Sequence, residues 1–430
     1  MSRHRTLSAA LRTVALALGL GLGAYAAAAE EEQKADVDDT VSGSIMKDAV
    51  GDVVLTDRAE WEAQLARYEG RPHPPIYYLG ASWLGISPDF VVAAHEGLDR
   101  IYLRDYKGAR AKFGQMNKDF PGMVIGPVGD VLVWQALMLE NFDFKFETQY
   151  QTASRQARQQ LEQAVVTPGN EAWEYFLLAG MLGIESIHTM RHEEYAKALS
   201  RGYEAMKAVR KCQELAPDFV DIQLGDGLFD YWATVISRST KLLPNTGDKR
   251  PEGIRQMMRV QERSLFLRAP ATLALTFTWI EEGKRDKALE SALRNYALYP
   301  KNIINNQVLG RVFMYNRKYA DAERIFKEVQ ATDPKNQRSH YYLGRLYVRW
   351  GKLDAALASL TTYLAFTDLS DAHRGYALYY KGQVHYRKKQ LDQAEAAWKQ
   401  AWKVGKIKRA KTRLEKLEER RAAGKSGKAG

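Results

Sequence analysis

The chain has 430 residues, more than the roughly 250 to 300 residues at which one hydrophobic core stops growing, so several modules or a repeat array are expected. Hydrophobic residues make up 45% and charged residues 27% of the chain, which excludes a wholly disordered or fibrous polymer. The single cysteine, Cys212, excludes an internal disulfide framework and a zinc site made of cysteines alone, and we expect it to be a buried structural thiol. The formal net charge is +11.

Residues 1–29 have the organisation of a cleaved secretory signal peptide. Arginines precede the apolar stretch 13–25, and small residues at 26–29 precede Glu30. The apolar stretch is shorter than the roughly 20 residues that a stable transmembrane helix needs, and no other segment reaches that length. We expect cleavage after Ala29, no transmembrane span in the mature chain, and a periplasmic location. The absence of cysteine at the cleavage point argues against a lipoprotein.

Two segments are expected before the repetitive part of the chain. Residues 30–57 are acidic at first and poor in aromatic residues, which predicts a flexible linker. Residues 58–89 contain an apolar Ile-Tyr-Tyr-Leu stretch among prolines, which predicts an extended Pro-rich N-terminal segment packed on the repeats after it. Its prolines are Pro72, Pro74, Pro75 and Pro88.

Beyond residue 90 the sequence contains internal repeats with a period of about 34 residues. The clearest unit carries Gly310 and Ala322, and the next unit repeats them as Gly344 and Ala356. The unit before it matches too. The step from Gly344 to Gly382 is longer by four positions, and we expect this insertion in a loop around Asp371.

The physical meaning of this period is a stack of helix pairs. Large residues three or four apart form an apolar stripe on one helix, and a second stripe follows on the next. Gly310, Gly344 and Gly382 allow the two helices of a pair to approach closely. Pro300 and Pro334 are expected to end the second helix of a pair, because proline has no N–H to donate within it.

These residues resemble the tetratricopeptide repeat family, in its period and its order of Leu-Gly, aromatic, Ala, Phe and Pro. The resemblance is strong over 269–408 and divergent over 90–268, where the helices are expected to be longer. The segment 217–244 resembles a variant found in exported bacterial repeat proteins of undefined role. The resemblance implies an all-α fold, a right-handed superhelical solenoid of stacked antiparallel helix pairs, with about eight units.

The C-terminal segment 409–430 is predicted to be a basic capping helix with a disordered tail. Residues 375–430 hold 16 basic and five acidic side chains, so the high isoelectric point belongs to this end of the chain. A polar helix of this kind seals the last apolar face of a solenoid. Its charge could also attract an anionic envelope surface, whereas an exported chain would not meet nucleic acid.

One group of residues could hold a metal ion. Glu185, His188 and His192 have spacings of three and four on one predicted helix, which is a permissive arrangement for a divalent metal. The order is not the His-Glu-x-x-His of zinc hydrolases, and Arg191 would oppose a cation. An ordinary polar helix is the favoured interpretation, so no metal or other cofactor is expected.

The resemblance also implies a partner-binding groove along the inner faces of the first helices. Guanidinium and phenol groups alternate there, which suits an acidic or C-terminal peptide segment. The residues at the matching positions are Arg311, Tyr315, Tyr341, Arg345, Arg349, Tyr379, Gln383, Tyr386 and Arg387. The Lys and Asn positions of the family's carboxylate clamp are not found, and solvent-facing helix sides remain the alternative interpretation.

We therefore expect an exported periplasmic scaffold or adaptor that binds protein partners of the cell envelope. Catalysis is not expected, because no ordered nucleophile or phosphate-binding motif is present. The alternative is a metal- or small-ligand-binding protein or an enzyme that uses the divergent region 90–260.

Overall fold

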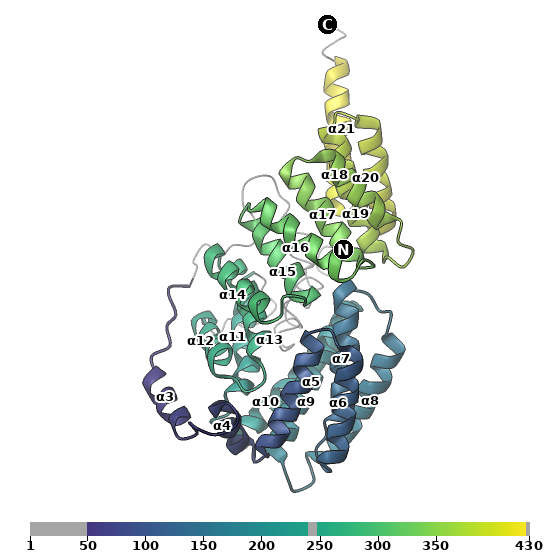
Figure 1. The fold of residues 1–430 in the computed structure, drawn as a ribbon. Helices are drawn as coiled ribbons and strands as arrows, with labels where there is room; N and C mark the ends of the chain where they lie inside the picture. Colours follow the sequence, from purple (N-terminus) through teal and green to yellow (C-terminus); the bar gives the residue numbers. More distant parts are fainter. Residues whose placement is uncertain (1–49, 240–246, 427–430) are drawn as a thin grey trace. The chain divides into compact units, whose positions relative to one another are not determined.

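The computed structural model of the chain describes residues 50–239 and 247–426 (Figure 1). The signal peptide expected at 1–29 lies outside the described residues, as does most of the linker expected at 30–57. All regular elements within the described ranges are helices, which confirms the predicted all-α class. None of these helices has both the length and the apolar character that crossing a bilayer requires.

The chain divides into two compact units. The first contains the described residues up to 137 together with 146–305, and the second contains 138–145 together with the described residues from 306 onward. The division after residue 305 differs from the boundary expected between 268 and 269. The repeats that most resemble the tetratricopeptide pattern are therefore shared between the two units.

The first unit is built from consecutive helices that pack as antiparallel neighbours. Its helices are α3 (Arg58–Ala66), α4 (Pro75–Leu84), α5 (Pro88–Tyr102), α6 (Tyr106–Asp119), most of α7 (Gly126–Asn141), α8 (Glu147–Ala164), α9 (Glu171–Arg191), α10 (Tyr195–Leu215), the 3-10 turn η1 (Val220–Ile222), α11 (Gln223–Ser239), α12 (Arg250–Arg263), α13 (Arg268–Glu281) and α14 (Arg285–Leu298). Helices α9 and α10 have 21 residues each, which confirms the prediction of longer helices in the divergent region.

The prediction of an extended segment over 58–89 is wrong, because α3 and α4 occupy most of it. The prolines that suggested extended chain instead begin helices. Pro75 and Pro88 each lie in the first turn of a helix, where an N–H would have no intrahelical acceptor. Ser87 caps α5 by accepting a hydrogen bond from the Phe90 N–H at 3.1 Å.

The part of the predicted linker that is described, residues 50–57, is packed on the first unit, so flexibility is wrong for these residues. Val50 and Val53 are buried. The Val50 N–H donates to Glu282 Oε2 at 2.7 Å, and Glu282 in turn pairs with Arg250 Nη1 at 3.1 Å. The ion pair between Glu282 and Arg250 is buried. Without the Val50 N–H, the buried Glu282 carboxylate would lose one of its hydrogen-bond donors. The N-terminal segment therefore satisfies polar groups of the interior.

A cluster of aromatic rings fills the middle of the first unit. Phe90 packs edge-on against Trp173 with ring centroids 5.0 Å apart, and Phe266 lies 5.7 Å from Trp173. His95 stacks on Phe266 at 5.3 Å, and Tyr77 stacks on His95 at 4.3 Å. These contacts join α4, α5, α9 and the turn before α13 into one core.

The turn between α12 and α13 is fixed by one buried carboxylate. Asp221 has no exposed surface and accepts hydrogen bonds from the backbone N–H groups of Leu265, Phe266 and Leu267 at 2.6, 2.6 and 2.9 Å. Asp221 lies within the 217–244 segment that the sequence singled out. Its structural role is to hold the start of the next helix.

The second unit contains helix pairs with a terminal cap. Its helices are α15 (Ile303–Tyr315), which begins at the end of the first unit, α16 (Tyr319–Thr332), α17 (Gln337–Trp350), α18 (Leu353–Leu364), α19 (Asp371–Arg387), α20 (Leu391–Gly405) and α21 (Lys408–Ser426). Helix α16 ends two residues before Pro334, as predicted. The four inserted residues do not form a loop around Asp371, because they extend α19 by one turn at its N-terminal end.

Glycines mark the closest approach of the two helices in each pair. A Cβ atom at Gly310 would lie 2.4 Å from the Phe326 ring, and one at Gly382 would lie 2.4 Å from the Trp398 ring. At Gly344 the same atom would meet a leucine side chain of α18 at 2.7 Å. Real Cβ contacts are longer than this, so the glycines confirm the close packing expected from the sequence.

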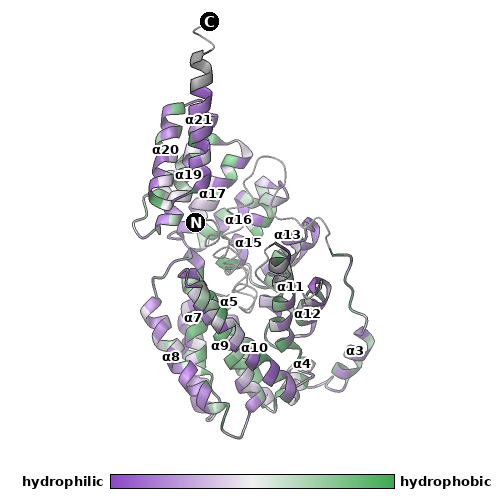
Figure 2. Ribbon diagram, turned by 180° about the vertical axis from the view of Figure 1, so that it is seen from behind, coloured by the Kyte–Doolittle hydropathy of each residue, from purple (hydrophilic) through white to green (hydrophobic). Residues whose placement is uncertain are grey.

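The terminal helix α21 covers α20 with a mixture of apolar and charged contacts. Leu417 is buried, whereas Arg421 pairs with both Glu395 and Asp392 of α20. Figure 2 shows the described part of α21 as mostly hydrophilic. Its helical backbone continues to residue 426. The predicted capping role is consistent with these contacts.

We predict that alanine has different effects at two glycines of one helix pair. Gly97→Ala would place a methyl group 2.6 Å from the buried Phe113 ring and should destabilise the protein by about 1 to 3 kcal/mol. Gly114 lies on α6, and a Cβ atom added there would meet no other side chain or distant backbone atom within 4 Å. Gly114→Ala should therefore be neutral or stabilising, because alanine favours helix. Urea unfolding followed by circular dichroism tests both. Equal effects of the two substitutions would contradict the packing described for α5 and α6.

We predict that His95 makes the protein less stable in acid. Burial is the main reason that its pKa falls from 6.5 to about 4, and its buried Nε2 atom has no hydrogen-bond acceptor among the described residues. Because the folded-state pKa lies below the unfolded value, the contribution of neutral His95 is complete above pH 6.5 and is lost as the pH falls toward 4.

The test compares the wild type with His95→Gln, which does not titrate in this range. The free energy of unfolding should fall less steeply between pH 6.5 and 4 in the variant, with a difference of at most about 3 kcal/mol. Parallel pH profiles for the two proteins would show that His95 is not the sensitive group.

Candidate functional site

The predicted groove residues lie on α15, α17 and α19, the first helices of the pairs in the second unit. Guanidinium groups and tyrosine rings alternate among them. The Arg345 Cζ atom lies 5.5 Å from the centroid of the Tyr341 ring and 5.3 Å from that of Tyr380, and the Arg349 Cζ atom lies 5.9 Å from the Tyr315 ring. The structure therefore brings together residues from three helices as a cation–π ladder.

Much of this ladder is buried. Arg311, Tyr341 and Arg345 are each 5% exposed, and Tyr379 is 2% exposed. Tyr379 also accepts a hydrogen bond from Gln383 Nε2 at 2.6 Å. These residues hold neighbouring helices together rather than forming an open face.

The accessible members of the predicted set lie at the C-terminal ends of the first helices. Tyr315, Arg349 and Tyr386 are partly exposed, and Arg387 is exposed. Arg387 donates to the Val348 carbonyl oxygen at the end of α17. We call Tyr315, Arg349, Tyr386 and Arg387 the helix-end cluster.

The structure adds two buried residues that the sequence argument missed. Arg338 donates to the Tyr342 hydroxyl at 2.5 Å, and its Cζ atom lies 4.8 Å from the centroid of the Phe142 ring. Phe142 lies on the loop that follows α7, far from Arg338 in the sequence. No spacing within the repeats could have identified this contact.

A second group of candidate side chains lies in the first unit, where α8 begins and α9 ends. The Glu147 carboxylate, from the first residue of α8, faces His188 of α9 and His192, the residue that ends this helix. His188 Nε2 lies 2.9 Å from Glu147 Oε2 and 3.1 Å from Oε1, and His192 Nε2 lies 3.4 Å from Oε1. One ligand atom from each of these three residues lies within 4.8 Å of the other two.

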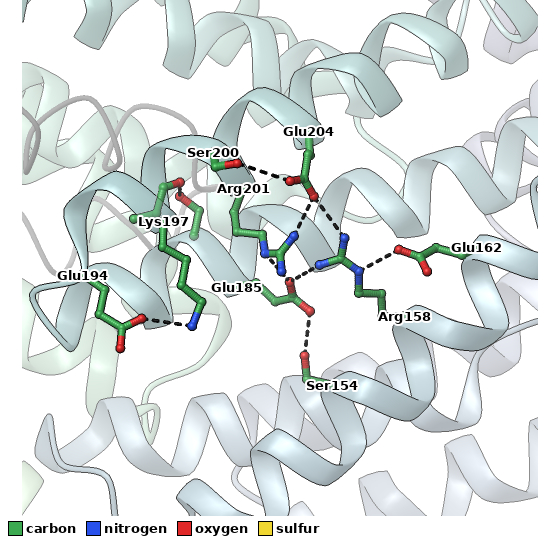
Figure 3. A network of polar contacts seen from close by, with 11 residues as sticks. Ser154, Arg158, Glu162, Glu185, Glu194, Lys197, Ser200, Arg201 and Glu204 are labelled. Carbon is green, nitrogen blue, oxygen red and sulfur yellow. Dashed lines mark hydrogen bonds and ion pairs between the residues drawn. The ribbon is translucent and has the colours of Figure 1, made fainter.

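Glu185, the carboxylate that the sequence placed with these histidines, belongs to a different network (Figure 3). Its oxygens accept from Ser154 Oγ at 2.8 Å and from Arg158 Nη1 at 3.1 Å, and Arg201 Nε lies 3.3 Å away. Two guanidinium groups neutralise it, which removes it as a metal ligand. Sequence spacing therefore identified both histidines of the cluster but the wrong carboxylate.

The surroundings favour a neutral imidazole beside an ionised carboxylate. Burial is the main cause that lowers the pKa of His188 to about 4. Burial alone would raise the pKa of Glu147, but hydrogen bonds from Gln151 and His188 outweigh it and lower that pKa. The ring of Tyr150 lies 4.0 Å from the His188 ring and fixes its orientation.

Cys212 is buried, and its thiol lies 3.3 Å from the Ala172 carbonyl oxygen. Burial raises the pKa of this thiol to about 12. A thiol in this state is a poor nucleophile, in keeping with the structural role expected from the sequence.

Comparison with known families gives a match that lies in the second unit. Residues 308–370 match the model of the tetratricopeptide repeat family, and this stretch runs from α15 to the loop before α19. This part of the chain consists of tetratricopeptide repeats. The match includes Gly310 and Gly344, where the two helices of a pair are in close contact. It also includes all the predicted groove positions on α15 and α17.

Solved structures similar to the chain come from different sources. A tetratricopeptide repeat protein from Parabacteroides merdae ATCC 43184 is 14% identical, with 66% of this chain and 98% of that chain covered and a TM-score of 0.39. The human IFIT1 dimer with m7Gppp-AAAA is 13% identical, with 79% and 87% covered and a TM-score of 0.46. No curated protein sequence matches the chain.

Tetratricopeptide repeats form scaffolds that bind protein partners, and such scaffolds are generally not enzymes. The repeats of the second unit therefore indicate a protein-interaction scaffold. Within the helix-end cluster, Arg420 of α21 donates to the Tyr386 hydroxyl.

Proposed function

We propose that this tetratricopeptide repeat protein is an exported, periplasmic scaffold that binds protein partners of the cell envelope through the helix-end cluster. The observation that carries the proposal is the grouping of Arg349, Arg387 and two tyrosines at the ends of three successive first helices. The buried ladder behind them fixes the spacing of these ends, so the surface is preorganised.

The chemistry of the cluster favours an acidic partner segment or a free C-terminal carboxylate. Arginine binds carboxylates through two parallel N–H···O hydrogen bonds, and tyrosine adds contact area at a low cost in side-chain entropy. Arg387 forms no ion pair with a carboxylate among the residues that the structure describes. Its guanidinium therefore keeps donors for a partner in addition to the one that Val348 uses.

The basic helix α21 supplies a second, weaker attraction in this proposal. Lys408, Lys411 and Lys416 are exposed, whereas Arg421 is engaged with α20. The exposed lysines would steer acidic partners or anionic envelope surfaces toward this unit and would act less at high salt.

Export is supported by the signal-peptide organisation of residues 1–29. The first described residues, from 50 onward, already pack on the first unit. Removal of residues 1–29 would leave residues 30–49 between the cleavage point and this packed segment.

We predict that charge reversal in the helix-end cluster releases the partner. After crosslinking in the native host, protein tagged behind Gly430 should copurify a defined envelope protein. The double variant Arg349→Glu and Arg387→Glu should lower its recovery about tenfold or more, because it places like charges opposite an acidic segment.

The matched control is Lys403→Glu, which reverses an exposed charge on α20 away from the cluster. Lys403→Glu should leave recovery of the partner unchanged. Undiminished recovery with the double variant would rule out the helix-end cluster as the binding surface.

We predict that the mature protein begins at Glu30. Mass spectrometry of protein isolated from the host should show the loss of residues 1–29. The double variant Ala27→Leu and Ala29→Leu should abolish cleavage after Ala29, because signal peptidase needs small residues at these two positions, whereas Ala24→Leu within the apolar stretch should still be cleaved after Ala29. Full-length protein in the wild type would refute export by a cleaved signal.

A further inference from the structure

We propose that Glu147, His188 and His192 form a binding site for one divalent transition-metal ion of the zinc class. The site lies in the first unit and is separate from the helix-end cluster. It uses a carboxylate from α8 and two imidazoles from the C-terminal end of α9, a helix that packs against α8.

The positions of the three side chains follow from the helices that carry them. His188 and His192 are four residues apart, so both project from one face of α9 at its C-terminal end. Glu147 is the first residue of α8, and the antiparallel packing of α8 on α9 brings it opposite these histidines. Two rigid helices therefore hold the ligands, rather than a long loop.

The two distances from the carboxylate oxygen to the imidazole nitrogens are close to those of a tetrahedral site, and all three ligand atoms lie within 4.8 Å of one another. With metal–ligand bonds of about 2.1 Å, ligand atoms of a tetrahedral zinc site lie about 3.4 Å apart. His192 Nε2 is 3.4 Å from Glu147 Oε1, and His188 Nε2 is 3.1 Å from the same oxygen. Small side-chain rotations would admit an ion between the three atoms.

Neighbouring residues hold the proposed ligands in place, as is usual around protein-bound metals. Gln151 Nε2 donates to Glu147 Oε1 at 2.8 Å, and Tyr150 packs against the His188 ring. Glu147 Oε2 is buried and accepts no hydrogen bond within the described part of the chain, although His188 Nε2 is 2.9 Å away. A bound cation would satisfy this oxygen.

The site is also reachable from solvent. The side chain of His188 is 3% exposed, but those of His192 and Glu147 are 34% and 31% exposed. An ion can therefore enter past His192. Three protein ligands leave a fourth position for water or for a small ligand, as in open zinc sites.

The ligand types select the metal. Two imidazoles with one carboxylate suit Zn²⁺ and its transition-metal neighbours, whereas Ca²⁺ and Mg²⁺ require mainly oxygen ligands. Arg191, one residue before His192, acts electrostatically on His188 and opposes a cation. We therefore expect weaker binding than in closed structural zinc sites of four ligands.

The experiment is a Zn²⁺ titration of untagged, chelator-treated protein in competition with a chromogenic chelator. The wild type should bind one Zn²⁺ per chain and show a higher Tm with zinc, while Ca²⁺ and Mg²⁺ should have no effect. His192→Ala and Glu147→Gln should each lower the affinity for Zn²⁺ about tenfold or more. Both changed side chains are partly exposed, and circular dichroism would verify that the variants fold.

Two controls and one rescue make the result decisive. Glu162→Gln removes another carboxylate from α8, and His73→Ala removes a histidine outside the site, and both should bind Zn²⁺ as the wild type does. His192→Cys should bind Zn²⁺ more tightly than His192→Ala, because cysteine is also a zinc ligand. Unchanged affinity in folded His192→Ala and Glu147→Gln, or no stoichiometric binding by the wild type, would overturn the proposal.

Discussion

The close contact between the two helices of a pair is the constraint on which both units depend. A glycine on the first helix faces a large side chain of the second, such as Phe113 opposite Gly97 and Phe326 opposite Gly310. These two rings are at most 1% exposed. A helix pair packed in this way behaves as one rigid element. The next pair stacks on the apolar face that is not used in the contact between the two helices of the pair.

This contact explains why the architecture could be predicted from the sequence. Glycine and a large apolar residue recur at fixed spacing. The two residues that contact each other lie within a single repeat, so their spacing in the sequence predicts the contact. Proline predicts where the second helix of a pair ends, and α16 does end just before Pro334. The inserted residues before Gly382 form an extra helical turn rather than a loop, because four residues are close to one turn and keep the apolar stripe in phase.

The parts that could not be predicted depend on contacts between distant residues. Glu147 is 41 residues from His188, and only the pairing of α8 with α9 brings them together. Glu185 has better spacing in the sequence, but Arg158 of α8 neutralises it. The burial of the Arg345 side chain among tyrosines could not be predicted either. A sequence shows that an arginine lies on one face of a helix, but it does not show which residues cover that face.

The bond between Val50 and Glu282 has a consequence for the order in which the first unit forms. These residues are separated by 232 positions, so the bond between them closes a long loop of the chain. The ribosome produces Val50 first and Glu282 much later. Until Glu282 has been made, the Val50 N–H lacks its acceptor, and buried Val50 and Val53 lack part of the structure that covers them. The first unit should therefore be vulnerable to aggregation and proteolysis during synthesis, and a chaperone that holds the early segment would have most effect in that interval.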